Sequence, residues 1–279
     1  LFSPARKYGI LHQKEVCRLK DNRINYDLER KLRRYAIGNL HLCGSEVIVR
    51  VNSIETPMFL ADLAAVVPQK PDLIMLPKTC TAEDIQMLAQ TLDRLEAENG
   101  LSAGAVGILA LVETALGVEN AFSIASASPR VQALFLGAED LSADLHCKRT
   151  KEGAEILYAR TRLVMAARAA GIDVYDTPFT DVDDDEGLCA DAALAKSLGF
   201  TGKAAISPRH LGNINRCFSP TQAEVDHANE VLAALEEGKR QGRGAVALHG
   251  KMIDAPIAAR AKRTLADAEQ ILKRGGTLA

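Results

Sequence analysis

Two carboxylates stand in this sequence where apolar runs end. Glu113 follows the run at residues 105–112, and Asp140 comes shortly after the run at 131–136. A carboxylate is costly in a hydrophobic core but well placed at the open end of a parallel barrel. Two such acids on neighbouring strands would suit Mg²⁺, a hard cation that takes oxygen ligands and keeps several waters. Each acid could instead cap the following helix or pair with a Lys or Arg, and the residues alone leave these interpretations evenly balanced.

Two cations also lie at the ends of predicted strands. Arg50 closes the run Val-Ile-Val-Arg-Val-Asn at 47–52, and Lys78 lies in the turn Pro-Lys-Thr at 77–79. A guanidinium can bind a substrate carboxylate through two parallel hydrogen bonds, although a structural salt bridge is an equal alternative for Arg50. Lys78 could form a Schiff base in a metal-free aldolase, or act as an electrostatic partner of the acids. Nearby carboxylates raise the pKa of a lysine, which counts against the Schiff base.

The pattern of apolar runs and amphipathic stretches indicates what positions these residues. We expect strands at 1–3, 23–27, 46–52, 72–77, 105–113, 131–137, 173–176 and 202–206. Helical periodicity separates them, as at 81–98 and 153–170. Eight strands alternating with helices predict an α/β fold with a parallel sheet, and eight is the number that closes a TIM (β/α)8 barrel. An open doubly wound sheet is the rival, but no glycine-rich nucleotide motif follows a strand.

The C-terminal part has a different pattern. A long helical stretch at 221–242 is followed by a glycine-punctuated extended link at 242–250, the segment Met-Ile-Asp-Ala-Pro at 252–256, and a final helix to about residue 273. We therefore expect residues 1–220 to form the barrel and 221–279 to form a helical extension or lid. This extension could fold back or be swapped onto a neighbouring subunit. The acidic run at 181–186 lacks EF-hand spacing and predicts a solvated helix N-terminus.

Composition excludes several classes of function. The net charge of −2 gives no support for nucleic acid or an anionic membrane as a partner, and no apolar run reaches the length of a membrane span. The six cysteines are scattered without a C-x-x-C pair, so we expect a reduced, cytoplasmic chain. The sequence shows no nucleophile–base motif of a serine or cysteine hydrolase.

Several motifs, in order and spacing, match a known family over nearly the whole chain. They are Leu-Phe-Ser-Pro at 1–4, Tyr-Asp-Leu-Glu at 26–29, Arg-Val-Asn at 50–52, Leu-Pro-Lys-Thr at 76–79, Val-Glu-Thr-Ala-Leu-Gly-Val at 112–118, Gly-Ala-Glu-Asp-Leu-Ser-Ala-Asp-Leu at 137–145, Phe-Thr-Gly-Lys at 200–203 and Met-Ile-Asp-Ala-Pro at 252–256. The chain resembles the HpcH/HpaI aldolase and citrate lyase superfamily, most closely its citrate lyase β-subunit-like branch.

This resemblance implies a role for each candidate residue. It implies a TIM barrel in which Glu113 and Asp140 hold Mg²⁺, and in which Arg50 binds the carboxylate of a keto acid. Gly137 and Ala138 correspond to the carboxylate-binding turn of the family. In malyl- and citramalyl-CoA lyase relatives the aspartate of the Met-Ile-Asp segment acts as an acid from a neighbouring subunit's lid, a role that would fall on Asp254. By the same resemblance we expect the protein to form a homo-oligomer, a trimer or hexamer.

The sequence departs from the family pattern in three places. Arg30 replaces the second acid of a D-L-E-D motif, and Ser207 replaces the histidine of an I-H-P turn. The segment before residue 27 also looks shorter than usual. These differences affect the surroundings of the metal and the contacts to a thioester or nucleotide.

Together these observations predict a Mg²⁺-dependent carbon–carbon lyase acting on a 3-hydroxy-acyl thioester of the citryl-, malyl- or citramalyl type. The products would be an α-keto acid (oxaloacetate, glyoxylate or pyruvate) and an acetyl-thioester, carried on CoA or an acyl carrier protein. Lys78 would assist substrate binding, and Glu29 or a metal-bound water would serve as the initial base. The alternatives are a free-acid hydroxy-keto-acid aldolase that releases pyruvate, and a non-catalytic subunit that binds keto acids or partners other lyase chains.

Overall fold

A parallel sheet forms the centre of the molecule. The computed structural model describes residues 8–11, 46–242, 245–273 and 276–279. Seven strands pair in chain order, each parallel to the next. They are β1 (Tyr8–Leu11), β2 (Glu46–Arg50), β3 (Leu73–Leu76), β4 (Gly107–Val112), β5 (Val131–Leu136), β6 (Asp173–Asp176) and β7 (Gly202–Lys203). Sequential parallel order with helical crossovers is the strand arrangement of a (β/α)8 barrel.

The predicted α/β class is confirmed, and six of the eight predicted strands correspond to β2 through β7. The predicted strands at 1–3 and 23–27 lie outside the described residues. β1 falls outside the predicted strands and pairs with β2 along its whole length.

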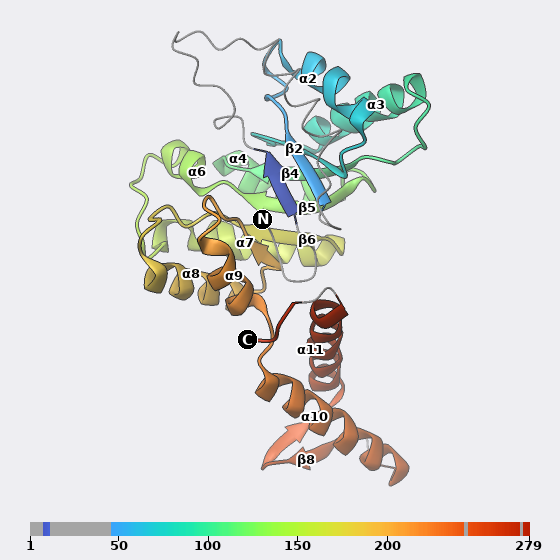
Figure 1. The fold of residues 1–279 in the computed structure, drawn as a ribbon, viewed down its shortest axis with the longest axis vertical. Coiled ribbons are helices and arrows are strands. Elements are labelled where there is room, and N and C mark those ends of the chain that lie inside the picture. The colour runs from blue at the N-terminus through green and yellow to red at the C-terminus, as the bar shows by residue number, and fades with distance from the viewer. Residues whose placement is uncertain (1–7, 12–45, 243–244, 274–275) are drawn as a thin grey trace.

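Helices follow the strands and cover the outer face of the sheet (Figure 1). They are α2 (Phe59–Val66), α3 (Ala82–Glu98), α4 (Ala115–Glu119), α5 (Ala121–Ser126), α6 (Ala138–Asp144), α7 (Leu157–Ala170), α8 (Asp185–Leu198) and α9 (His210–Phe218). Short 3₁₀ turns at Val67–Gln69 and Ala154–Ile156 complete them. Local signals set the ends: Thr81 and Asp84 form a capping box at the start of α3, and Gly171 ends α7 with φ of 72°.

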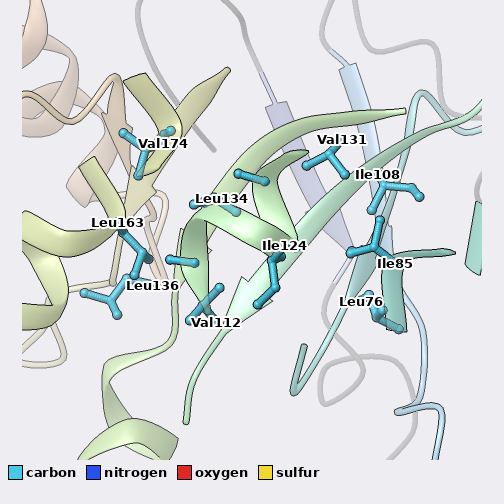
Figure 2. Close-up of a cluster of buried hydrophobic side chains, with 14 of the residues drawn as sticks. Leu76, Ile85, Ile108, Val112, Ile124, Val131, Leu134, Leu136, Leu163 and Val174 are labelled. Carbon is cyan, nitrogen blue, oxygen red and sulfur yellow. The ribbon is translucent and has the colours of Figure 1, made fainter. Parts of the chain in front are cut away.

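Strand residues alternate between two buried clusters. In β4, Ile108, Ala110 and Val112 pack outward against the helices, while Leu109 and Leu111 face inward. Figure 2 shows the outward set, in which strand side chains meet those of α3, α5 and α7. The inward cluster comprises Ile48, Leu73, Met75, Leu109, Leu111, Ala133, Phe135, Tyr175 and Ala204. Because the alternation has a period of two, it predicts which face each residue past a strand end presents.

The chain ends in a lobe that extends away from the sheet (Figure 1). This lobe contains α10 (Gln222–Arg240), an antiparallel hairpin of β8 (Val246–Leu248) and β9 (Lys251–Ile253), and α11 (Ala255–Lys273). Its own small core includes Val231, Leu235 and Ile253. α10 begins one residue past the predicted boundary at 220/221, although the division into domains stays a prediction. Within the described part of the chain, no helix is long and apolar enough to cross a membrane.

Candidate active site

Three of the predicted site residues, Arg50, Glu113 and Gly137, lie at the carboxyl edge of the sheet. Arg50 ends β2, and Glu113 directly follows β4 on the same face as the inward residues Leu109 and Leu111. Gly137 follows β5, whose Leu136 pairs with Val112 of β4. The alternation therefore directs Arg50, Glu113 and the Gly137 position to the inner side of the barrel mouth. This is the edge at which TIM-barrel enzymes place their reacting groups.

Glu113 is the most perturbed acid of this edge. Its side chain is only 3% exposed. Burial, a hydrogen bond to Asp140 and the charge of Asp140 raise its pKa from 4.5 to about 7, while the backbone N–H of Lys78 and the charge of Arg50 oppose the shift. The Lys78 N–H donates to Oε1 of Glu113 at 2.9 Å. A buried carboxylate beside a second carboxylate gains most from a bound cation, so these acids fit a metal better than they fit helix capping.

Glycine at position 137 lets β5 approach this carboxylate closely. A Cβ at Gly137 would lie 2.7 Å from both Cβ and Oε2 of Glu113. Any larger residue would push the Glu113 side chain out of its position. Gly137 is also the N-cap of α6, the helix that carries Asp140 in its first turn. Asp140 is exposed, which leaves its carboxylate open to solvent and to a ligand.

The amides of the predicted carboxylate-binding turn have partners within the chain. Gly137 N–H donates to the carbonyl of Val112 at 2.9 Å, and Ala138 N–H donates to Oγ1 of Thr177 at 3.2 Å. Thr177, which directly follows β6, belongs to none of the sequence motifs that indicated the site. The role of Gly137 and Ala138 toward a substrate carboxylate stays a prediction.

Lys78 contributes to the site through its backbone. Its φ of 52° places it in the left-handed region, which is uncommon for a non-glycine residue and turns the N–H toward Glu113. Its side chain is exposed. The next residue, Thr79, is fully buried, with its N–H bound to the Leu111 carbonyl. A Schiff-base lysine is usually desolvated, and the exposed ammonium of Lys78 lacks that environment.

Of the two other predicted catalytic residues, one falls outside the described residues and one lies in the C-terminal lobe. Glu29 lies outside the described residues, as does Arg30. Asp254 connects β9 to α11, and its Oδ1 accepts from the Ile257 N–H at 3.4 Å. The hairpin that precedes Asp254 lies at the end of the lobe far from the sheet (Figure 1). The lobe that contains Asp254 therefore extends away from the sheet whose edge holds Glu113.

A group of four buried charges lies behind the site, and the sequence analysis did not identify it as a unit. Arg160 of α7 forms a two-pronged ion pair with Asp176 at 3.0 and 2.9 Å and contacts Asp191 of α8 at 2.6 Å. Lys203 contacts Asp176 at 2.7 Å and Asp191 at 2.5 Å. All four residues are at most 6% exposed. We call this group, in which two cations balance two anions, the buried charge cluster.

The remaining sequence features have structural roles. In the acidic run, Asp184 caps α8 by accepting from Gly187 N–H, and Lys151 bridges Asp181 and Asp184. This confirms the predicted helix N-terminus. Ser207 accepts from Arg209 N–H at 3.3 Å within the turn before α9. Among the residues that the structure covers, no group of three or more His, Cys, Asp or Glu is arranged to hold a metal, so a cation at Glu113 and Asp140 would need other oxygen ligands.

Comparison with known proteins agrees with this geometry. The family model described as HpcH/HpaI aldolase/citrate lyase matches residues 33–208. The chain belongs to this family. Within it, the citrate lyase subunit beta of Escherichia coli strain K12 is 40% identical over 243 residues, which cover 87% of this chain and 80% of the relative. A (3S)-malyl-CoA thioesterase of Cereibacter sphaeroides is 34% identical over 230 residues, which cover 82% of this chain and 76% of the relative.

Some solved structures similar to this chain contain bound ligands. The protein CitE from Mycobacterium tuberculosis, in complex with magnesium, acetoacetate and coenzyme A, is similar with a TM-score of 0.72 and 29% identity. The match covers 90% of this chain and 87% of that one. A citrate lyase β subunit from the same organism, complexed with oxaloacetate and magnesium, has a TM-score of 0.61 and 26% identity over 76% and 86% of the two chains. Family membership and these relatives confirm the prediction of a lyase.

Proposed function

We propose that this lyase cleaves a carbon–carbon bond in a 3-hydroxy-acyl thioester of the citryl-, malyl- or citramalyl type, releasing an α-keto acid and an acetyl-thioester. The observation that carries the proposal is the buried Glu113 paired with Asp140 at the carboxyl edge of the sheet. Relatives named for citrate lyase and for malyl-CoA, together with a related structure containing magnesium and coenzyme A, support this substrate class.

The residues of the site fit a divalent cation. Glu113 is buried beside Asp140, with one oxygen held by the Lys78 N–H, so its orientation is set before any ligand arrives. Two carboxylates leave room for water and substrate oxygens around Mg²⁺. When bound, the ion supplies Lewis-acid stabilisation for charge that develops on substrate oxygens. Related structures that contain magnesium support the choice of metal.

The chain's own residues would orient the substrate. Arg50, whose charge acts on Glu113, is placed to pair with the carboxylate of the keto-acid half. The turn at Gly137 and Ala138 lies next to Glu113 and would face the same carboxylate. Lys78, exposed at the rim, would add positive potential for an anionic thioester.

We further propose that the active unit is an oligomer, a trimer or hexamer. Cleavage leaves an electron pair on the acetyl-thioester carbon, and that carbon must receive a proton. Asp254 would supply this proton from a second copy, because its lobe extends away from its own sheet. Glu29 remains a candidate for removing the substrate hydroxyl proton.

A direct test is a turnover screen with the purified full chain. Citryl-, malyl- and citramalyl-CoA would each be supplied with and without Mg²⁺. The matching acyl-carrier-protein thioesters would be tested separately in the same way. Keto acid release would be followed with a coupled dehydrogenase. We expect Mg²⁺-dependent release from at least one thioester. Cleavage of only free hydroxy-keto acids would support the aldolase alternative, and no turnover by the oligomer would support the non-catalytic one.

A further inference from the structure

Thr177 lies at the barrel mouth although no motif pointed to it. It directly follows β6, whose Tyr175 belongs to the inward cluster. The two-residue alternation places Thr177 on the same inner face as Glu113, with β5 between the two strands that carry them. Thr177 is 2% exposed, and its hydroxyl accepts the Ala138 N–H at 3.2 Å.

That hydrogen bond replaces a missing helix cap. α6 begins after Gly137, which has no side chain to cap the free amides of the first turn. Thr177 supplies an acceptor for one of them from the neighbouring strand. Asp140 lies in this same first turn. The Thr177 hydroxyl therefore connects the end of β6 to the segment that presents the second carboxylate.

The buried charge cluster fixes Thr177 in turn. Lys203 Nζ donates to the Thr177 carbonyl at 2.7 Å, and Ala204 N–H donates to the adjacent Asp176 carbonyl at 3.0 Å. Lys203 is itself held by Asp176 and Asp191. Because the cluster residues are buried and mutually paired, the backbone at 176–177 has little freedom to shift.

We propose that Thr177 is a positioning residue: its hydroxyl anchors the first turn of α6 and thereby holds Asp140 opposite Glu113 for metal binding. This inference rests on the proposed function, because it assigns Thr177 to the metal site. A merely structural threonine would affect folding stability but not metal affinity, so the two roles differ in what they change.

The test compares Thr177→Val, Thr177→Ser and the matched control Thr201→Val. Thr201 is also a threonine whose hydroxyl accepts a backbone amide, that of Val174 at 3.0 Å, but it lies at the amino end of β7. Mg²⁺ affinity would be measured by calorimetry on folded protein, alongside the melting temperature. Hydrogen exchange of the peptide 137–144 would be measured without metal.

We expect Thr177→Val to raise the Mg²⁺ Kd roughly two- to tenfold, the worth of one neutral hydrogen bond, and to speed exchange of α6. Thr177→Ser should restore both, and Thr201→Val should lower the melting temperature alone. An unchanged Kd or unchanged α6 exchange in Thr177→Val, or an equal rise of Kd in Thr201→Val, would overturn the inference. Absence of Mg²⁺ binding by the wild-type protein would instead overturn the proposed function, and the metal-independent exchange result separates the two failures.

Discussion

Replacing Glu113 by glutamine should stabilise the metal-free protein at alkaline pH. The side chain of Glu113 is buried, and its pKa rises from 4.5 to about 7 on folding, chiefly through burial and the neighbouring Asp140. The folded state therefore binds this proton more tightly than the unfolded chain does. The resulting stability is complete below about pH 4.5 and is lost as the pH rises through about 7.

The size of the expected change in the free energy of unfolding follows from the pKa shift of Glu113. A rise from 4.5 to about 7 corresponds to about 3 kcal/mol at 1.36 kcal/mol per pH unit, which is an upper value because the effective dielectric constant around buried groups in proteins exceeds that of a dry interior. Glu113→Gln removes the charge, while its amide oxygen can still accept the Lys78 N–H. We expect the variant to be more stable than wild type by about 1–3 kcal/mol above pH 8 and similar near pH 5.

The assay is urea unfolding in EDTA across this pH range, with Glu96→Gln as the matched control. Glu96 is equally buried at 1%, but its contacts with Arg130 and with the amides of Gly104 and Val106 lower its pKa. Its substitution should therefore destabilise the protein at pH 8. The reasoning would be refuted if Glu113→Gln were less stable than wild type at pH 8, or if it kept the wild-type slope of stability against pH.

Three further experiments test other parts of the structure. Gly137→Ala should cost about 1–3 kcal/mol of stability and weaken Mg²⁺ binding, because its Cβ would lie 2.7 Å from Cβ of Glu113; normal calorimetric affinity would contradict this. Lys203→Met leaves two buried carboxylates sharing one cation, so urea unfolding should show a loss of about 3–5 kcal/mol, and a loss below 1 kcal/mol would argue against a tightly coupled cluster. Asp254→Asn and Arg50→Ala proteins should each be inactive, yet regain activity when their subunits are mixed; a mixture no more active than its parts would rule out a shared site.

The strands and the two carboxylates could be predicted because their signals are local. Apolar runs of strand length marked β2 through β7, and the capping signals at Thr81 and Gly171 marked helix ends. The Glu113 and Asp140 pair could be proposed because parallel strands bring their carboxyl ends to one edge. Whether the pair is a metal site or two separate helix caps depends on the burial of the carboxylates and the distance between them. Both are set by the tertiary structure.

The residues that were missed depend on contacts between distant segments. Thr177 joins β6 to α6, and the buried charge cluster joins α7, α8, β6 and β7; no spacing in the sequence brings these elements together. The hairpin β8–β9 was predicted only as an extended link. Its turn, His249 and Gly250, has positive φ at both residues. Asn-Gly is the usual sequence of such a turn, so the His-Gly sequence here did not predict it.

The most direct test of the central claim is the Mg²⁺-dependent cleavage rate of a thioester substrate by Glu113→Gln and Asp140→Asn proteins that remain folded. If the two carboxylates hold the catalytic cation, both variants should lose at least about a hundredfold in kcat/KM, or about 3 kcal/mol of transition-state stabilisation, together with calorimetric Mg²⁺ binding. Folded variants that bind Mg²⁺ and cleave at the wild-type rate would contradict the claim.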